Sequence, residues 1–224
     1  ITYCHYENFS SLEEVAGAKA EILHPKTQYA IIHKKNIDFD VIYRQCLAKQ
    51  VVYPSDNQIL SPFKETHFTE NFIAGYLLAK YIGMNDDQIR LASLSLSAMK
   101  LEHRFQKIYR GGVLFIDDSY NANTLSTSVA IQNLPTPSGN GRKILVFGEM
   151  KELGVISITS HQIIANLAVL AMDIVLCLGR EAKVIADRFS KQSKEGYYCY
   201  DYKELKEKLF KIVRQDDVVL IKGA

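Results

Sequence analysis

Two adjacent carboxylates and the polar cluster behind them are the residues of this chain best suited to chemistry. Residues 113–123 read VLFIDDSYNAN, in which an apolar run stops at Asp117 and Asp118. Apolar and β-branched residues bounded by glycines and by Asp, Asn and Ser are typical of a buried strand in a parallel sheet, whose ligands bind outside its carboxyl edge. We therefore expect the functional site at the end of this strand.

The second half of the chain alternates short apolar runs with helical patterns. Strands are expected at 113–116, 143–147, 174–178, 197–200 and 218–221, and helices at 126–134, 161–171, 181–189 and 202–213. This alternation predicts βαβ units and a mostly parallel sheet. Several runs end in polar residues or glycine: Asp117-Asp118, Gly148-Glu149, Gly179-Arg180 and Lys222-Gly223. The predicted fold is therefore α/β, with a doubly wound, Rossmann-like domain in this half.

The first half also alternates helices and strands, but less regularly. Helices are expected at 11–23, 39–48, 69–81 and 86–99, and strands at 29–33 and 50–53. Ser11, with Glu14 three residues later, is a helix-capping pattern. The segment LEHRFQKIYRGG has no apolar periodicity, so we place a domain boundary near Lys107 and expect two domains, 1–107 and 108–224.

The composition favours a soluble globular protein and limits its partners. Of 224 residues, 47% are hydrophobic and 23% charged, and the net charge of +2 is spread along the chain without a basic stretch, so we expect no nucleic acid partner. The four cysteines have no metal-ligand spacing, which favours buried thiols in a reducing compartment. No apolar run approaches the roughly 18 residues of a membrane helix, and no secretory signal opens the chain. A cytoplasmic monomer without membrane contact is the simplest expectation.

The segment DDSYNAN, followed by KILVFGEMKELG and His161, resembles the Mur ligase family of peptidoglycan synthesis. Further segments resemble these ligases in the same order: HYENFSSLEEVAGAKAEI, TENFIAGYLLAKYIG, LEHRFQ and DVVLIKG. DSYNAN is specific to the branch that adds D-alanyl-D-alanine to UDP-N-acetylmuramoyl-tripeptide, whereas HRF and AK recur across the family. The resemblance covers nearly the whole chain. It implies that 1–107 is the carboxy-terminal part of a central ATP-binding domain, and that 108–224 is the C-terminal domain without its last helix.

The reaction implied by the resemblance is ATP-dependent amide formation. The terminal carboxylate of the tripeptide becomes an acyl phosphate, which the amine of D-alanyl-D-alanine then attacks. Such chemistry needs cations near the phosphates and the developing oxyanion, and two substrates held in attack geometry. ATP and Mg²⁺ are therefore the expected cofactors. UDP-N-acetylmuramoyl-tripeptide and D-alanyl-D-alanine are the expected partners, with a role in cell wall biogenesis, cell shape and cell division.

A magnesium site at His5 and Lys19 is a second implication of the resemblance. His5 would bind the ion between the nucleotide and the acyl phosphate, and Lys19 matches the family lysine that becomes carbamylated. A carbamate is an anion that can hold a hard cation, which an ammonium cannot do. A satisfied strand-end histidine and a solvated helix lysine are the alternatives.

Three residues match the nucleotide-binding positions of the family. Asn71 matches an asparagine that contacts adenine. An amide suits this contact because it can pair with both a donor and an acceptor on the base edge. Arg104 and Asp118 match residues that hold phosphate and ribose, a guanidinium fork for phosphate oxygens and a carboxylate for hydroxyls. The alternatives are a helix-start asparagine for Asn71 and a helix cap for Asp118.

The resemblance also implies that Tyr120, Asn121 and Asn123 shape the side of the site that faces the D-alanyl-D-alanine dipeptide. A backbone turn would explain the two asparagines equally well. The charged residues of 149–152 match a substrate-side loop, with exposed charge as the alternative. His161 is interpreted as a residue of a helix face rather than of the site.

The phosphate-binding pattern G-x-x-x-x-G-K-[ST] does not occur in these residues. We therefore expect a fragment or a shortened copy of a longer ligase that does not turn over ATP by itself. Two departures from the family, a short segment between His33 and His67 and Phe68 at a frequent Asn position, bear on the adenine contact. The alternative functions are a non-catalytic nucleotide-binding or scaffold module and a folate-type glutamate ligase, and YNAN argues against the latter.

Overall fold

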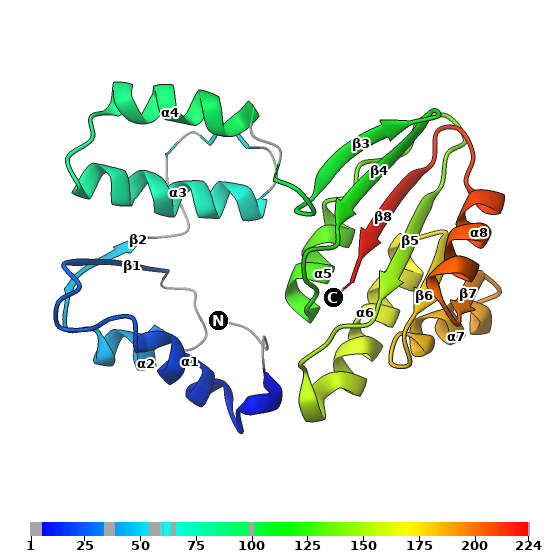
Figure 1. Cartoon of the computed structure of the whole chain (residues 1–224), viewed down its shortest axis with the longest axis horizontal. Helices are drawn as coiled ribbons and strands as arrows, with labels where there is room; N and C mark the ends of the chain where they lie inside the picture. Colours follow the sequence, from blue (N-terminus) through cyan, green and yellow to red (C-terminus); the bar gives the residue numbers. More distant parts are fainter. Residues whose placement is uncertain are drawn as a thin grey trace. The chain divides into compact units, whose positions relative to one another are not determined.

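The computed structural model describes residues 6–33, 39–53, 59, 61–63, 66–98 and 101–223. They form two compact units, Phe9–Met99 and Lys100–Ala224, and the second also includes the short helix η1 (Tyr6–Asn8) (Figure 1). The two units divide between Met99 and Lys100, whereas the sequence suggested a boundary near Lys107. Lys107 lies inside strand β3 (Gln106–Arg110), which belongs to the second unit. The side chains of β3 are mostly exposed, so this strand leaves no apolar signal in the sequence.

The first unit contains a parallel pair of strands and four helices within its described residues. Its elements are α1 (Leu12–Ala20), β1 (Tyr29–His33), α2 (Phe39–Gln45), β2 (Lys49–Tyr53), α3 (Thr66–Tyr81) and α4 (Asp86–Ala98). A small core joins α1, β1 and α2 through Ala16, Ala20, Ala30, Ile32 and Ile42.

Helix α1 begins where its capping pattern predicts. The backbone N–H of Glu14 donates to Ser11 Oγ at 3.1 Å, and the backbone N–H of Ser10 donates to the Glu14 carboxylate at 2.6 Å. These two bonds satisfy donors that would otherwise be left without partners at the helix start.

The second unit is a six-stranded sheet in the order β3-β4-β8-β5-β6-β7. β3 pairs antiparallel with β4, and the remaining pairs are parallel, which confirms the predicted mostly parallel, doubly wound fold. Its strands after β3 are β4 (Val113–Asp118), β5 (Lys143–Gly148), β6 (Ile174–Leu178), β7 (Glu195–Cys199) and β8 (Val218–Lys222). Its helices are α5 (Thr124–Gln132), η2 (Gly154–Ile156), α6 (Ser157–Ala171), α7 (Lys183–Lys191) and α8 (Tyr202–Ile212).

Helices cover both faces of this sheet (Figure 1). α8 packs Leu205 and Leu209 onto one face, against residues such as Ile144 and Leu176. α5, α6 and α7 pack side by side on the other face. Because central strands such as β5 are buried on both sides, their sequences read as continuous apolar runs, and this made them predictable.

Among the residues that the structure describes, one helical stretch, Gly154–Ala171, is long and apolar enough to cross a membrane by length and composition. In the structure it belongs to the second unit, where α6 buries Ile164, Ala165 and Ala168 and packs beside α5 and α7. The core helix of an α/β domain has the same apolar composition, so the packing accounts for this segment.

Candidate functional site

The carboxyl ends of β4 and β8 bring Asp118 and Lys222 together. They are register partners, and Lys222 Nζ donates to Asp118 Oδ2 at 2.7 Å and to the Asn121 carbonyl oxygen at 2.7 Å. The side chain of Lys222 is only 3% exposed and that of Asp118 17%. Since a buried ammonium is costly without a partner, this ion pair is what makes a lysine tolerable here. The sequence placed Lys222 at the end of a predicted strand but did not assign it to the site, although that position was a usable signal.

The second oxygen of Asp118 holds the turn that precedes β3. The backbone N–H of Phe105 donates to Asp118 Oδ1 at 3.0 Å, and the Phe105 side chain is buried. His103 and Phe105 have positive φ angles of 58° and 54°, which side chains with a β-carbon rarely adopt. Asp118 therefore links the end of β8 to a backbone turn that needs outside support.

Asp117 binds the same turn from the neighbouring position. Its Oδ2 lies 2.8 Å from His103 Nδ1, and its Oδ1 accepts from Ser119 Oγ at 2.6 Å and from Ser119 N at 3.1 Å. Partial burial disfavours the charged carboxylate, but the hydrogen bonds from Ser119 and His103 outweigh it, so the pKa of Asp117 lies below its ordinary value. The two adjacent carboxylates thus both serve residues 103–105.

Arg104 and Tyr120 form the exposed part of this cluster. The Arg104 guanidinium lies over the Tyr120 ring, 4.0 Å from its centroid, which is cation–π geometry. The backbone N–H of Tyr120 donates to the His103 carbonyl oxygen at 3.0 Å. The structure therefore places Arg104 against Tyr120, on the turn that Asp118 holds through Phe105.

Asn121 and Asn123 have local structural roles. Asn123 is the N-cap of α5: its side chain accepts from Ser126 N at 2.8 Å, while Asn123 N donates to Ser126 Oγ at 3.1 Å. Asn121 Oδ1 accepts from the backbone N–H of Ala122, and the Asn121 carbonyl accepts from Lys222. The backbone-turn explanation accounts for both asparagines, and their contact with a dipeptide stays a prediction.

The loop after β5 is fixed by a buried histidine. His161 Nε2 accepts from Met150 N at 3.0 Å, and Nδ1 donates to the Ser157 carbonyl oxygen at 2.8 Å. Burial lowers the pKa of His161, which is therefore neutral at neutral pH. This agrees with its interpretation as a helix-face residue. Glu149, in the same loop, accepts from Glu181 N at 3.2 Å.

The remaining predicted residues belong to the first unit or lie outside the described residues. Lys19 is exposed in the last turn of α1, and Asn71 is exposed on α3. His5 lies outside the described residues. Among the residues that are described, no three His, Cys, Asp or Glu side chains gather in a way that could hold a metal ion.

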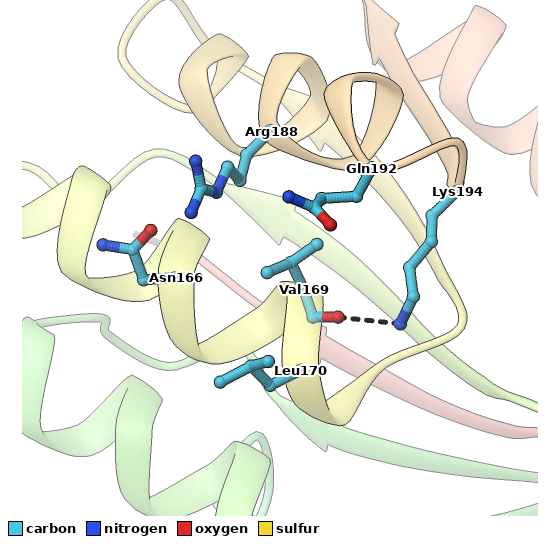
Figure 2. Close-up of a pocket in the computed structure, with 6 residues that line it drawn as sticks. All are labelled: Asn166, Val169, Leu170, Arg188, Gln192 and Lys194. Carbon is cyan, nitrogen blue, oxygen red and sulfur yellow. Dashed lines mark hydrogen bonds between the residues drawn. The ribbon is translucent and has the colours of Figure 1, made fainter.

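A surface hollow of about 450 Å³ lies between α6 and α7, away from this cluster (Figure 2). Its lining residues are Asn166, Val169, Leu170, Arg188, Gln192 and Lys194. Lys194 Nζ donates to the carbonyls of Val169 and Met172 at 2.7 and 3.0 Å, so its charge caps the end of α6. Because these helices run antiparallel to the strands, the hollow lies toward the amino edge of the sheet. We do not assign the site to it.

A doubly wound α/β domain with a charged cluster at the carboxyl edge of its sheet is the class defined by this fold and site. A family model described as "Mur ligase, glutamate ligase domain" matches residues 103–224. The match covers more than half of the chain, which therefore belongs to the Mur ligase family.

Among curated proteins, this chain is 33% identical to the UDP-N-acetylmuramoylalanine--D-glutamate ligase of Zymomonas mobilis, over 60% of the chain and 32% of that relative. It is 27% identical to the UDP-N-acetylmuramoyl-tripeptide--D-alanyl-D-alanine ligase of Escherichia coli, over 100% of the chain and 56% of that relative. The chain thus spans 32% of the length of the first relative and 56% of the length of the second.

Solved structures share the fold. MurF from Acinetobacter baumannii superposes with a TM-score of 0.79 at 22% identity, covering 100% of this chain and 55% of that one. The MurF ligase of Thermotoga maritima, in complex with ADP, superposes with a TM-score of 0.76 at 21% identity, covering 100% of this chain and 57% of that one. At such identities the likeness shows the fold alone.

Proposed function

We propose that this chain is part of an ATP-dependent ligase that joins D-alanyl-D-alanine to UDP-N-acetylmuramoyl-tripeptide in peptidoglycan precursor synthesis. The observation that carries the proposal is the extent of the similarity. The Escherichia coli relative of this name aligns with 100% of the chain, through both units, whereas the D-glutamate ligase aligns with 60%. The DSYNAN loop, in which Asp118 pairs with Lys222 and Tyr120 stacks against Arg104, is consistent with this branch.

The second unit would contribute the phosphate and ribose contacts of the nucleotide. Each oxygen of Asp118 accepts one hydrogen bond described above, and an ionised carboxylate has about four acceptor positions. Asp118 therefore has the capacity to accept ribose hydroxyls while it stays fixed by Lys222 and Phe105. Arg104 is exposed, and its guanidinium fork suits phosphate oxygens.

The acceptor side of the site is assigned to the loop after β4. Tyr120, with 64% of its surface exposed, can contact a substrate with the ring face that Arg104 does not cover. Asn121 and Asn123, which shape the turn of this loop, are proposed to face the same substrate. Asn71 of the first unit is proposed for the adenine. Lys19, once carbamylated, is proposed for the metal together with His5, which lies outside the described residues.

ATP would supply the phosphoryl group that activates the tripeptide carboxylate. The residues described here would bind and orient the nucleotide and hold the two substrates for attack, and such positioning is a large part of catalysis in two-substrate reactions. The sequence of these 224 residues contains no G-x-x-x-x-G-K-[ST] pattern, so we expect no ATP turnover from this chain alone. Product formation in a ligation assay with the isolated chain would contradict that expectation.

Calorimetry with ADP and magnesium tests the nucleotide site directly. The wild-type chain is compared with Asp118→Ala and with Asp187→Ala, a matched control in which an exposed carboxylate of α7 is removed from the same unit. Binding by the wild type and the control but not by Asp118→Ala supports the ligase site. Equal binding by all three proteins excludes Asp118 from it. No binding by any of them favours a scaffold module.

A further inference from the structure

We propose that His103, held by Asp117, is a positioning residue that sets the turn from which Arg104 reaches the nucleotide. The nature of the ligand rests on the proposed function above. The turn itself, residues 103–105, is defined by contacts within the second unit, so its control by His103 can be tested without any ligand.

The backbone of this turn cannot be expected to hold its shape by itself. His103 and Phe105 both lie in the left-handed region, with φ of 58° and 54°, and Arg104 stands between them. Side chains with a β-carbon are disfavoured there, so the surrounding structure must supply what keeps the turn in place. The direction of the Arg104 side chain depends on both flanking residues.

Four contacts tie the turn to the end of β4 and the loop after it. His103 Nδ1 lies 2.8 Å from Asp117 Oδ2, and Phe105 N donates to Asp118 Oδ1 at 3.0 Å. Tyr120 N donates to the His103 carbonyl at 3.0 Å, and Arg104 stacks on the Tyr120 ring. Of these contacts, the bond to Asp117 is the one made by the side chain of His103, the first residue of the turn with a positive φ.

The carboxylate of Asp117 is oriented by hydrogen bonds that do not involve His103. Both the hydroxyl and the backbone N–H of Ser119 donate to its Oδ1, which leaves Oδ2 facing the imidazole. The His103 side chain is 56% exposed and that of Asp117 is 16% exposed. Since a half-exposed histidine adds little to a hydrophobic core, its geometry is better explained by control of the turn than by packing.

Two substitutions separate the His103 side chain from its backbone. His103→Gly accepts the left-handed conformation but removes the donor to Asp117. His103→Asn also tolerates this conformation, and its amide nitrogen stands near the position of Nδ1, so it can donate to Asp117. The turn of residues 103–105 should therefore become more mobile in His103→Gly, which loses the bond to Asp117, and should stay ordered in His103→Asn, which retains it.

The first measurement is amide hydrogen exchange at Phe105 and Tyr120, whose N–H groups hold the turn. In His103→Gly, we expect exchange at both amides to be about tenfold faster, the change that a hydrogen bond to a charged group can produce. In His103→Asn it should stay near the wild-type rate, while the thermal midpoints of all three proteins remain close. Unchanged exchange in His103→Gly overturns the proposal, whatever the ligand.

The second measurement is the affinity for ADP with magnesium by calorimetry. We expect about tenfold weaker binding for His103→Gly and recovery in His103→Asn. Faster exchange without weaker binding would overturn the role of His103 in nucleotide binding. A wild-type chain that does not bind ADP would instead count against the proposed function, and the exchange result would still decide whether His103 controls the turn.

Discussion

At the scale of single residues, the most buried charge of the site is that of Lys222, and Asp118 is its ion-pair partner. Both side chains are largely removed from water, and each compensates the charge of the other. Removing one partner of a buried pair costs about 3–5 kcal/mol, because the remaining charge keeps its desolvation penalty.

Lys222→Met should therefore lower the free energy of unfolding by about 3–5 kcal/mol. The double variant Lys222→Met/Asp118→Asn should be less destabilised than the sum of the single variants, since it leaves no charge unpaired. Denaturant titration of the wild type and the three variants gives this coupling. Strict additivity would show that the two side chains do not support each other.

Asp117 should make the free energy of unfolding depend on pH in the acidic range. Its folded pKa lies below the ordinary value of 3.8, so its ionised form stabilises the fold above about pH 4, and this stabilisation is lost as the pH falls through the lower folded pKa. Asp117→Asn should therefore cost about 1–2 kcal/mol at pH 7 and progressively less below pH 4. Unfolding titrations of both proteins between these pH values check the sign, and a constant difference would contradict it.

At the scale of elements, the start of α5 separates structure from substrate binding. Asn123 caps this helix through reciprocal bonds with Ser126. Asn123→Ala should lower stability by about 1 kcal/mol, and Asn123→Ser, which supplies another good cap, should restore most of it. Thermal unfolding measures this difference.

The same pair of variants tests the predicted dipeptide contact. If Asn123 only caps α5, a ligase containing Asn123→Ser should keep the KM of the wild type for D-alanyl-D-alanine. A raised KM at unchanged stability would give Asn123 a direct role in binding, as the resemblance implies.

At the scale of the whole molecule, each compact unit has a core of its own. Ile32 belongs to the cluster of the first unit, and Leu176 to that of the second. Leu176→Ala should destabilise the second unit by about 2–5 kcal/mol, because the fully buried side chain leaves a cavity. Hydrogen exchange should then show lost protection in residues 101–223, with the first unit unchanged. Equal loss in both units would show that they unfold together.

Regular alternation along the chain predicted most of the elements. β1 and β6 span the residues expected for them, because each combines apolar and β-branched residues between clear breaks. The start of α6 was placed too late, at His161 instead of Ser157, because no capping side chain marks it and η2 leads directly into the helix. β3 was missed because it is an exposed edge strand, joined to β4 through Gly111-Gly112, both with positive φ.

The sequence by itself determined that Asp117 and Asp118 end a buried strand at the carboxyl edge of a parallel sheet, and that the chain resembles the Mur ligases. Periodicity reports which face of an element is buried, but not which strand lies beside it. The tertiary structure decided that β8 lies between β4 and β5, which sets Lys222 against Asp118 across a separation of 104 residues. It also decided that His103 reaches Asp117, because that contact requires the β3–β4 hairpin to fold back on itself.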